Sequence, residues 1–346
     1  MQAYRSNVGK PVILLIDGAF ALRRCMYQPA LRELSNSKGM PTGAIYGFLN
    51  SLKSAVNSLS AQSLIVCWEG GHSERRQEVY ADYKRRTYEE EPEKDEHGYT
   101  DYEYYCHQLS WIQKILECLG VVQLRVPGKE GDDVLFQASH LLNGQKIIVS
   151  EDSDFFALVR EDVSVFRPIK REFVDEANFY RITETATPRH YLYYKVLAGD
   201  GSDNIPAIAK GVGWATIKKI LEAIENPDDL SPARIIKEAS QLKGSRFTKV
   251  VDAGASAISR NLDLIDISRE TFNIFQLQEM ADKLSMQLYP DVATAHKLLH
   301  ALEFNPDTVN YIVNKLSLMS TYPLANLVDR SYIKRILSGE SSSLQG

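Results

Sequence analysis

The chain has 346 residues, 44% hydrophobic and 25% charged, which is typical of a globular protein with one large domain or two lobes. Its formal net charge of −5 by itself argues against a polybasic nucleic-acid-binding protein. The longest early apolar run, 12–16, is too short for a signal-peptide core and far below the roughly 20 residues of a membrane helix. The four cysteines are scattered and form no C-x-x-C pair, which argues against a zinc knuckle or a disulfide framework.

Apolar runs and helical spacing alternate along the first 150 residues. Continuous apolar runs predict strands buried on both faces, at 12–16, 63–68, 121–126 and 146–149. Helical spacing predicts helices between them, at 43–59, 109–119 and 132–142. This order predicts an α/β domain with helices on both faces of a parallel sheet. From about residue 190 the pattern is mostly helical, with helices predicted at 191–198 and 215–224 and further candidates in 256–346.

The segment 88–105 interrupts this pattern with eight acidic residues and one lysine. Low apolar content and high charge predict a solvated or independently placed excursion. A partner-binding segment and an electrostatic gate are the alternatives.

Acidic residues follow the predicted strands. Because ligands bind at the carboxyl ends of strands in an open parallel sheet, we expect these acids to meet at one edge. Taken singly, each has an ordinary interpretation as a helix cap or a turn residue. Together their carboxylates would repel one another, and a divalent cation removes that repulsion. The candidate metal ligands are Asp17, Glu69, Glu130, Asp132, Asp133, Asp152, Asp154, Asp200 and Asp203.

The all-oxygen donor set favours Mg²⁺, with Mn²⁺ as a substitute, over zinc. Two such ions about 4 Å apart are a recurring device for phosphodiester hydrolysis. Competing enzyme classes lack their motifs, because the sequence has no P-loop, no G-x-S-x-G and no H-E-x-x-H.

Several motifs resemble those of the 5′-nucleases, a family that includes flap endonucleases, phage 5′→3′ exonucleases and the nuclease domain of bacterial DNA polymerase I. The likeness covers about residues 12–225. The matching segments are Ile16-Asp-Gly18, 42–49, Glu130-Gly-Asp-Asp133, Ser150-Glu-Asp-Ser-Asp154 and Gly199-Asp-Gly-Ser-Asp-Asn-Ile-Pro206. The last two of these five segments are the most specific.

The resemblance implies roles for the acids. Asp17, Glu130, Asp132 and Asp152 match positions that hold or organise a first metal group, and Asp17, Asp132 and Asp152 are the acids expected to be catalytic. Asp154, Asp200 and Asp203 match a second group, with Asp133 close by.

The resemblance also implies how nucleic acid is bound. Tyr83 would stack on a nucleobase, and Lys84 would contact the scissile phosphate as a catalytic residue. Further basic candidates are Arg75, Arg85 and Arg86, for which a solvated basic face is the alternative. The turn Gly211-Val-Gly213 resembles a helix–turn–helix element for duplex DNA that often holds K⁺, and Lys210, Lys218 and Lys219 add positive charge beside it.

Two positions depart from the family pattern. Glu69 stands where the family usually has Asp, and Thr87 stands where the basic clamp usually continues with arginine. Arg85 or Arg86 would then supply the missing charge.

The resemblance therefore implies a PIN-like α/β nuclease domain over 1–190, with a helical arch at about 71–108. A helix-three-turn-helix region over 191–255 would bind duplex DNA, and 256–346 would form a helical region of unassigned role. The expected activity is 5′-3′ exonuclease or flap endonuclease action on DNA, with RNA–DNA hybrids as a further substrate, during replication or repair. We expect a monomer in the cytoplasm of a bacterium or phage-infected cell, with a replication protein as a possible partner. The alternatives are a non-catalytic binder of DNA junctions and a PIN-like ribonuclease.

Overall fold

The computed structural model describes residues 10–85, 93–95 and 98–338, which fall into two compact units. Unit 1 comprises 1–71, 88–151 and 272–346, and unit 2 comprises 72–87 and 152–271. These units divide the chain at other points than the three regions expected from the sequence. In the part that is described, no helix is long and apolar enough to cross a bilayer.

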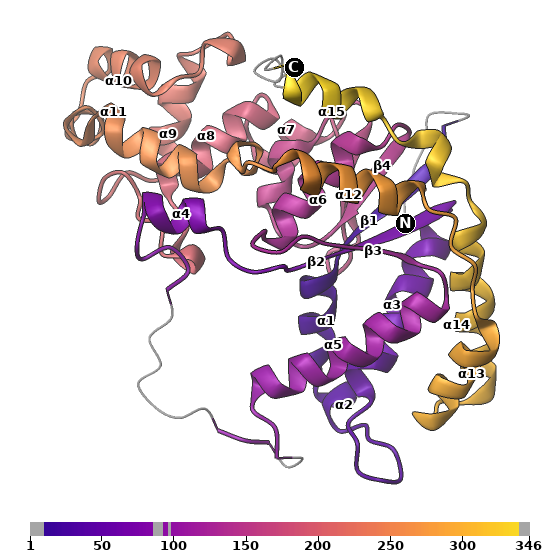
Figure 1. Cartoon of the computed structure of the whole chain (residues 1–346). Helices are drawn as coiled ribbons and strands as arrows, with labels where there is room; N and C mark the ends of the chain where they lie inside the picture. The colour runs from indigo at the N-terminus through magenta and orange to yellow at the C-terminus, as the bar shows by residue number, and fades with distance from the viewer. Residues whose placement is uncertain (1–9, 86–92, 96–97, 339–346) are drawn as a thin grey trace. The chain divides into compact units, whose positions relative to one another are not determined.

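The strands of unit 1 form a parallel sheet in the order β3-β2-β1-β4 (Figure 1). Their bounds are β1 Val12–Asp17, β2 Ser63–Trp68, β3 Val122–Arg125 and β4 Gln145–Val149. All of β2 and β4 and nearly all of β1 are buried, as expected for strands covered on both faces. The register pairs Asp17 with Cys67 and Ile16 with Val149, so the carboxyl ends of three strands lie level.

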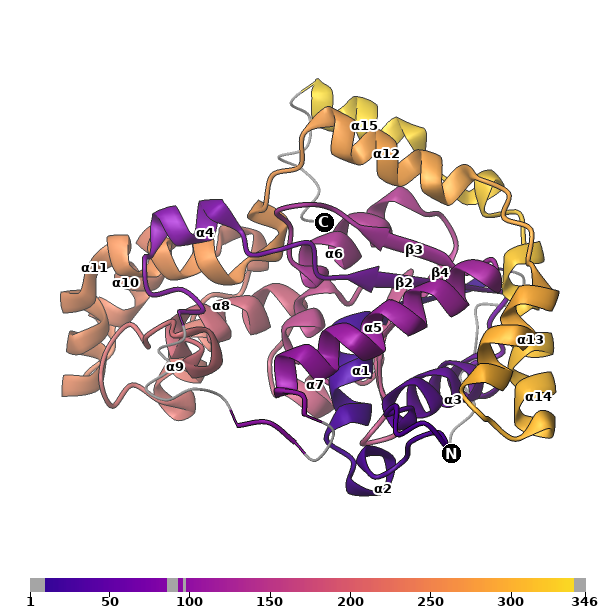
Figure 2. The same ribbon diagram turned by 60° about the horizontal axis from the view of Figure 1, so that its bottom comes forward.

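Helices cover both faces of this sheet (Figure 2). One layer contains α1 Gly18–Met26, α3 Gly43–Ser58 and α5 Asp101–Cys118, and the other contains α6 Gly131–Leu141 and α12 Ile274–Ser285. Short α2 spans Pro29–Arg32 beside α1 and α3. The first residue of α1 approaches β2 closely, because a Cβ at Gly18 would lie 2.4 Å from the Trp68 ring. The predicted α/β class is confirmed.

Two parts of this layer differ from expectation. The helix expected at 109–119 begins at Asp101, inside the acidic segment, and α1 was not predicted. Thr100 and Glu103 form a capping box at the start of α5, and acidic residues in a first helical turn interact favourably with the helix dipole. The acidic residues Asp101 and Glu103, which suggested a loop in the sequence, therefore stabilise the start of α5.

The segment from Phe272 onward belongs to unit 1 and braces it. Helices α13 Val292–Ala301 and α14 Pro306–Ser317 pack against α5 and α3, and α15 Arg330–Leu337 packs against α6 and α12. Tyr332 of α15 is 2% exposed and donates a hydrogen bond of 2.7 Å to Gln137 of α6. The Tyr332 ring also stacks on His140, with 5.5 Å between ring centroids. The C-terminal helices thus hold the helix whose first turn carries Glu130, Asp132 and Asp133.

Replacing Tyr332 by phenylalanine should lower the free energy of unfolding by about 1–3 kcal/mol, because the buried Gln137 oxygen loses this donor. Urea denaturation measures the change. Tyr311→Phe is the matched control, because its hydroxyl accepts from Asn57 on an exposed surface and should change stability by less than about 0.5 kcal/mol. Equal effects of the two variants would contradict the bracing role.

Unit 2 contains a short hairpin and a cluster of helices. The antiparallel strands β5 Val163–Arg167 and β6 Glu172–Val174 were not predicted. The helices are α4 Glu74–Val79, α7 Phe179–Thr183, α8 Pro188–Ala198, α9 Trp214–Glu222, α10 Pro232–Gln241 and α11 Ser245–Ile265. The apolar faces of α8, α9, α10 and α11 share one core that includes Val196, Ile217, Ile235 and Ile258. The helices predicted at 191–198 and 215–224 correspond to α8 and α9.

Candidate active site

The predicted acids divide between the two units, with five in unit 1 and four in unit 2. In unit 1, Asp17 ends β1. Its Oδ1 accepts the Phe20 N–H at 2.9 Å, and its Oδ2 accepts the Ser150 hydroxyl at 2.9 Å. Asp17 therefore caps α1 and links the carboxyl end of β1 to that of β4. These contacts fix the direction of its carboxylate at the edge of the sheet.

Glu69 directly follows β2, and its side chain reaches the start of α6. Its Oε2 accepts the Gly131 N–H at 3.1 Å. The backbone allows this approach, because Gly70 donates to the Lys129 carbonyl at 2.9 Å and a Cβ at Gly70 would lie 1.8 Å from the Val126 oxygen. The longer side chain of glutamate therefore reaches the first turn of α6, where further predicted acids stand.

Two acids of α6 form its cap. Glu130 and Asp133 make a capping box, in which Asp133 Oδ2 accepts the Glu130 N–H at 3.2 Å. Glu130 is 2% exposed and Asp133 is fully buried, whereas Asp132 is half-buried. The ordinary interpretation as a helix cap thus applies to Glu130 and Asp133, and Asp132 is the acid of this turn that reaches solvent most.

Tyr105 of α5 was not singled out in the sequence. Burial raises its pKa to about 12, and the carboxylates of Glu69 and Asp17 also raise it, against Arg23. The Arg23 guanidinium lies 5.6 Å from the Tyr105 ring centroid. A neutral phenol and a cation therefore border the acids of unit 1. No sequence signal distinguished this tyrosine from the others in the acidic segment.

In unit 2, Lys195 of α8 lies between two predicted ligands. Its Nζ is 2.8 Å from Asp154 Oδ1 and 3.0 Å from Asp200 Oδ2. Asp152 Oδ1 accepts the Asp154 N–H at 2.9 Å, which fixes the turn that carries both acids. The sequence did not mark Lys195 as part of the site, because nothing local distinguishes a lysine on a helix.

The pKa of Asp154 is raised to about 6, first by burial and then by the Asp152 carboxylate, against the opposing effect of Lys195. For Asp200, burial acts in the same direction, but hydrogen bonds from Ser202 and Lys195 outweigh it and leave the pKa lowered. The cluster thus carries negative charge that one lysine compensates only in part. Oxygen donors and excess negative charge fit a hard divalent cation. Among the described residues, however, no three His, Cys, Asp or Glu side chains already stand as ligands around one point.

The raised pKa of Asp154 predicts a pH dependence of stability. In the unfolded chain the Asp154 carboxyl binds its proton only below about pH 4, the ordinary pKa of aspartate. Between about pH 4 and pH 6 the folded state therefore holds more protons than the unfolded state. The free energy of unfolding of the metal-free protein should therefore fall as the pH rises through this window. Urea denaturation in EDTA should show this slope for wild type and for Asp252→Asn, an exposed control, but a weaker slope for Asp154→Asn. Parallel curves for all three would contradict the assignment.

Lys84 and the loop at 200–204 hold each other. The Lys84 N–H donates to the Asp203 carbonyl at 3.0 Å, and its Nζ lies 3.7 Å from Asp203 Oδ2. Asn204 donates to the carbonyls of Asp82 and Arg85 at 3.0 and 2.7 Å. Lys84 has a φ of 50°, a left-handed conformation that needs such support in a residue other than glycine. Asn204 is therefore a positioning residue that the sequence left unassigned.

Tyr83 and Arg75 differ from their expected placement. Tyr83 is 3% exposed and packs in the core of unit 2, so in this conformation its ring offers no face to a nucleobase. Arg75 donates hydrogen bonds to Glu270 Oε2 at 3.1 Å and to the Asp263 carbonyl at 2.8 Å, so it links α4 to the end of α11 and the loop after it. The exposed Arg85 forms an ion pair with Asp82 at 3.3 Å. Arg86 and most of the acidic segment before Asp95 lie outside the described residues.

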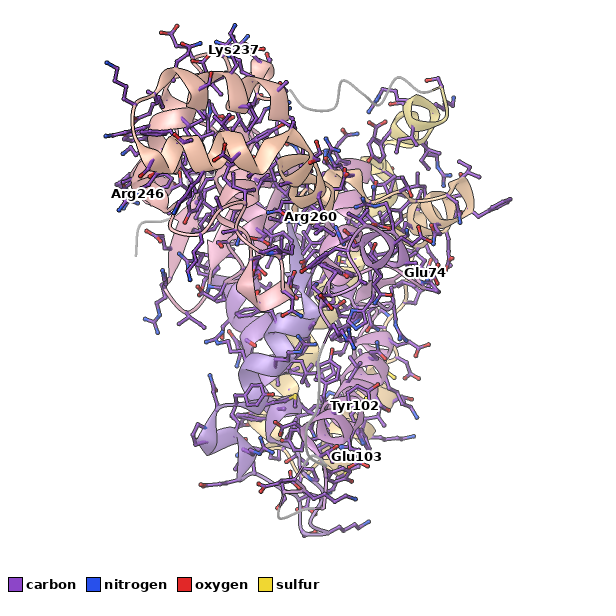
Figure 3. The ribbon with its side chains drawn as sticks, turned by 90° about the vertical axis from the view of Figure 1, so that its left-hand side faces the viewer. Glu74, Tyr102, Glu103, Lys237, Arg246 and Arg260 are labelled. Atoms are coloured by element: carbon purple, nitrogen blue, oxygen red, sulfur yellow. The ribbon has the colours of Figure 1, made fainter. Side chains whose placement is uncertain are left out.

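The glycine turn 211–213 leads directly into α9. Gly211 has a φ of 83°, and Gly213 caps α9 without a side-chain acceptor. Lys219 lines a depression of about 270 Å³ together with residues at the start of α11, among them Ser245 and Arg246. Figure 3 labels Arg246 beside the helices of unit 2. Lys210 is exposed, and its carbonyl accepts from Lys249 at 3.2 Å. Lys218 is not on this depression.

The contact between Glu69 and Gly131 makes the departure from aspartate testable. Glu69→Asp shortens the side chain by one methylene and should lose this hydrogen bond. We expect a 10- to 100-fold loss in Mg²⁺ affinity or cleavage rate, the usual range for groups around a metal site. Mg²⁺ titrations of the rate measure it, and Glu69→Gln, which keeps the acceptor but not the charge, separates the two contributions. An unchanged rate for Glu69→Asp would show that the additional methylene is immaterial.

Comparisons with known proteins show which family the chain belongs to. Residues 12–185 match the family model of the 5′-3′ exonuclease N-terminal resolvase-like domain. A 5′-3′ exonuclease of Aquifex aeolicus is 34% identical over 222 residues, covering 62% of this chain and 71% of that protein. DNA polymerase I of Thermus aquaticus is 30% identical over 67% of this chain, which spans only 27% of the polymerase. The crystal structure of the T5 D15 protein superposes with a TM-score of 0.58 at 18% identity, over 89% of this chain and 99% of that one.

A parallel sheet with helices on both faces makes this chain an α/β protein. Within that class, the chain belongs to the 5′-3′ exonuclease family.

Proposed function

We propose that this protein is a metal-dependent, structure-specific 5′-nuclease that hydrolyses phosphodiesters in DNA at 5′ ends, nicks and flaps. The observation that carries the proposal is the pairing of Lys84 with the loop at 200–204, which places the predicted phosphate-binding cation next to the predicted ligand Asp203. Two structures of the related T5 D15 protein support it, one with metal ions and one, named a flap endonuclease, with DNA and metal ions.

The predicted ligands would hold two or more Mg²⁺ ions, for which Mn²⁺ could substitute. Bound there, divalent ions supply activated water and neutralise charge on the reacting phosphate. Lys84 would contact the scissile phosphate and stabilise its developing charge. Lys195 pairs with both Asp154 and Asp200 and so reduces the repulsion between their carboxylates. Asn204 fixes the backbone around Lys84.

Duplex DNA would bind at the start of α9 and α11. Each helix has a glycine as its N-cap, Gly213 for α9 and Gly244 for α11, and no side-chain cap, so the first N–H groups are available to phosphate oxygens. Lys219 and Arg246 line the depression beside them. The turn 211–213 is the proposed K⁺ site. The net charge of −5 does not oppose this proposal, because the nine predicted ligands and the segment 88–105 together carry −16, which leaves +11 on the rest of the chain.

Cleavage of 5′-labelled flap, nicked, single-stranded and RNA–DNA substrates tests the proposal, with Mg²⁺ or with EDTA. We expect cutting near the junction of duplex and single strand, abolished by EDTA and by Asp152→Ala. Binding to junctions without cutting in Mg²⁺ would favour a non-catalytic DNA-binding protein instead. Cleavage confined to single-stranded RNA would favour a PIN-like ribonuclease.

A further inference from the structure

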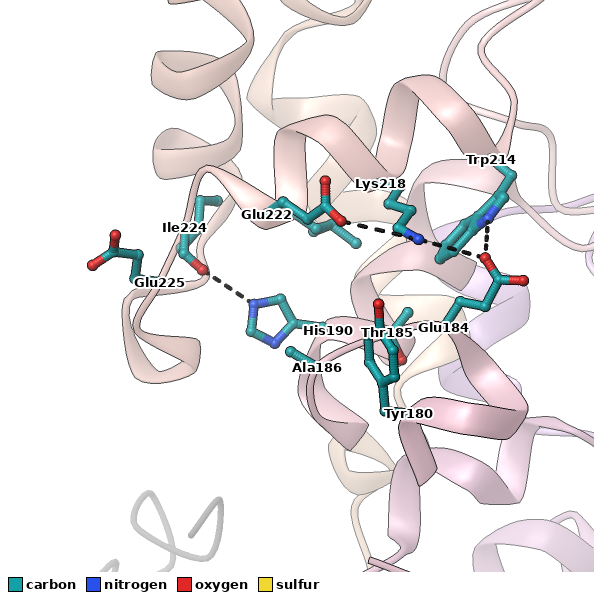
Figure 4. Close-up of a pocket in the computed structure, with 11 residues that line it drawn as sticks. Tyr180, Glu184, Thr185, Ala186, His190, Trp214, Lys218, Glu222, Ile224 and Glu225 are labelled. Carbon is teal, nitrogen blue, oxygen red and sulfur yellow. Dashed lines mark hydrogen bonds and ion pairs between the residues drawn. The ribbon is translucent and has the colours of Figure 1, made fainter. Parts of the chain in front are cut away.

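Unit 2 has a second pocket, formed by α7, the start of α8 and α9 (Figure 4). Its volume is about 200 Å³, and its wall is mostly apolar. Buried Leu221 and Ile224 contribute to this wall, together with half-buried Trp214 and the exposed ring of Tyr180. The remaining lining residues are Glu184, Thr185, Ala186, His190, Lys218, Glu222 and Glu225.

Helix α9 separates this pocket from the basic depression. Trp214, Lys218 and Glu222 line the pocket, whereas Thr216 and Lys219 line the depression that also contains Arg246. The adjacent lysines of the sequence therefore serve different surfaces. Lys218 lies 3.5 Å from Glu184 and 4.0 Å from Glu222, so its charge is engaged within the pocket.

The pocket is acidic and preformed. Three glutamates, Glu184, Glu222 and Glu225, are exposed at its rim, against the single cation of Lys218. The Trp214 Nε1 lies 3.3 Å from Glu184 Oε2, and its ring meets Tyr194 edge to face at 4.8 Å. This excess of negative charge disfavours a phosphate backbone, and the fixed indole lowers the side-chain entropy that the protein loses when a ligand docks.

His190 closes the floor of the pocket. It is 4% exposed, with Nε2 3.2 Å from the Ile224 carbonyl and Nδ1 2.8 Å from the Thr187 hydroxyl. Both ring nitrogens are thus occupied by contacts within the protein. The recognition groups left to a ligand are the aromatic rings and the rim carboxylates.

We propose that this pocket docks a short segment of a partner protein in which an apolar side chain stands next to lysine or arginine. The apolar side chain would pack on Trp214 and Leu221, and the cation would pair with Glu222 and Glu225 beside the aromatic rings. Tryptophan and tyrosine in a concave, preformed site are typical anchors of protein interfaces. The Lys218 Nζ already lies 5.7 Å from the Trp214 ring centroid, so the partner's cation would pair with the rim carboxylates and not with the indole face. The proposal assigns a partner-binding surface that is independent of the nuclease reaction.

Selection of random peptides displayed on phage against the full chain tests this directly. We expect enriched peptides to carry lysine or arginine next to an aliphatic or aromatic residue. Labelled copies of these peptides should bind Glu222→Lys at least about tenfold more weakly than wild type, which corresponds to about 1.4 kcal/mol. Asp252→Lys, an exposed charge reversal on α11, is the matched control and should bind like wild type.

Two further measurements separate this proposal from the nuclease proposal. The rate of flap cleavage by Glu222→Lys should equal that of wild type, and this expectation does not depend on the outcome of the peptide-binding measurement. Excess duplex DNA should leave the peptide affinity unchanged. Peptides that bind Glu222→Lys and wild type equally, or that duplex DNA displaces, would overturn the docking proposal and leave the nuclease assignment untouched.

Discussion

Replacing Asp152 by alanine should lower the cleavage rate constant by about 10³-fold or more, equivalent to about 4 kcal/mol of transition-state stabilisation. The alanine variant loses two things at once. It removes a predicted metal ligand, and it removes the acceptor for the Asp154 N–H, which fixes the turn that carries both acids. The affinity for flap DNA should change far less, because Asp152 is not one of the basic contacts.

Asp152→Asn separates the two contributions, because an asparagine side-chain oxygen can still accept the Asp154 N–H. Equal losses for Ala and Asn would assign the effect to charge, whereas a smaller loss for Asn would assign part of it to the turn. Single-turnover cleavage and filter binding measure rate and affinity separately. Asp162→Ala, which removes an ion pair with Arg160 elsewhere in unit 2, is the control. A rate within about twofold of wild type for Asp152→Ala would exclude a catalytic role.

Replacing Lys84 by methionine should lower kcat by about 10²- to 10³-fold with little change in KM, the size observed when one preorganised charge donor to a transition state is lost. Methionine keeps an unbranched side chain, so the left-handed backbone at this position is no more strained than in wild type. The pairing with Asp203 would be lost, but the backbone contacts of residues 82–85 with the 200–204 loop would remain.

Arg85→Ala provides the comparison. Arg85 is exposed and pairs only weakly with Asp82, so as a phosphate contact it should affect binding rather than chemistry. We expect a weaker affinity and a smaller salt dependence of binding, with kcat unchanged. If Lys84→Met raises KM and leaves kcat intact, Lys84 serves substrate binding and not the transition state.

Local sequence was sufficient for most elements of unit 1. Its strands are continuous apolar runs, and burial on both faces of a parallel sheet requires that pattern. The prediction failed where local chemistry was ambiguous. The acids at 101–103 read as a solvated loop, yet in the first turn of α5 they stabilise a helix end.

The predicted ligands stay predictions, but the structure shows where each of them lies. Acids that immediately follow strands were identifiable because the register of a parallel sheet brings strand ends level. The sequence could not separate a ligand candidate such as Asp132 from the neighbouring Asp133, whose carboxylate caps the helix. It also could not show that the ring of Tyr83 is buried, because burial depends on helices far along the chain.

The sequence by itself determined the fold class, the family and the identities of the acids, because those depend on hydrophobic periodicity and on motifs within short segments. Only the tertiary structure decided which charges meet. Lys195 reaches Asp154 and Asp200, Asn204 holds the backbone of Lys84, and Lys218 faces acids while Lys219 faces the basic depression. These pairs of interacting residues depend on how elements that are distant in the sequence pack together, and the local sequence pattern does not contain that information.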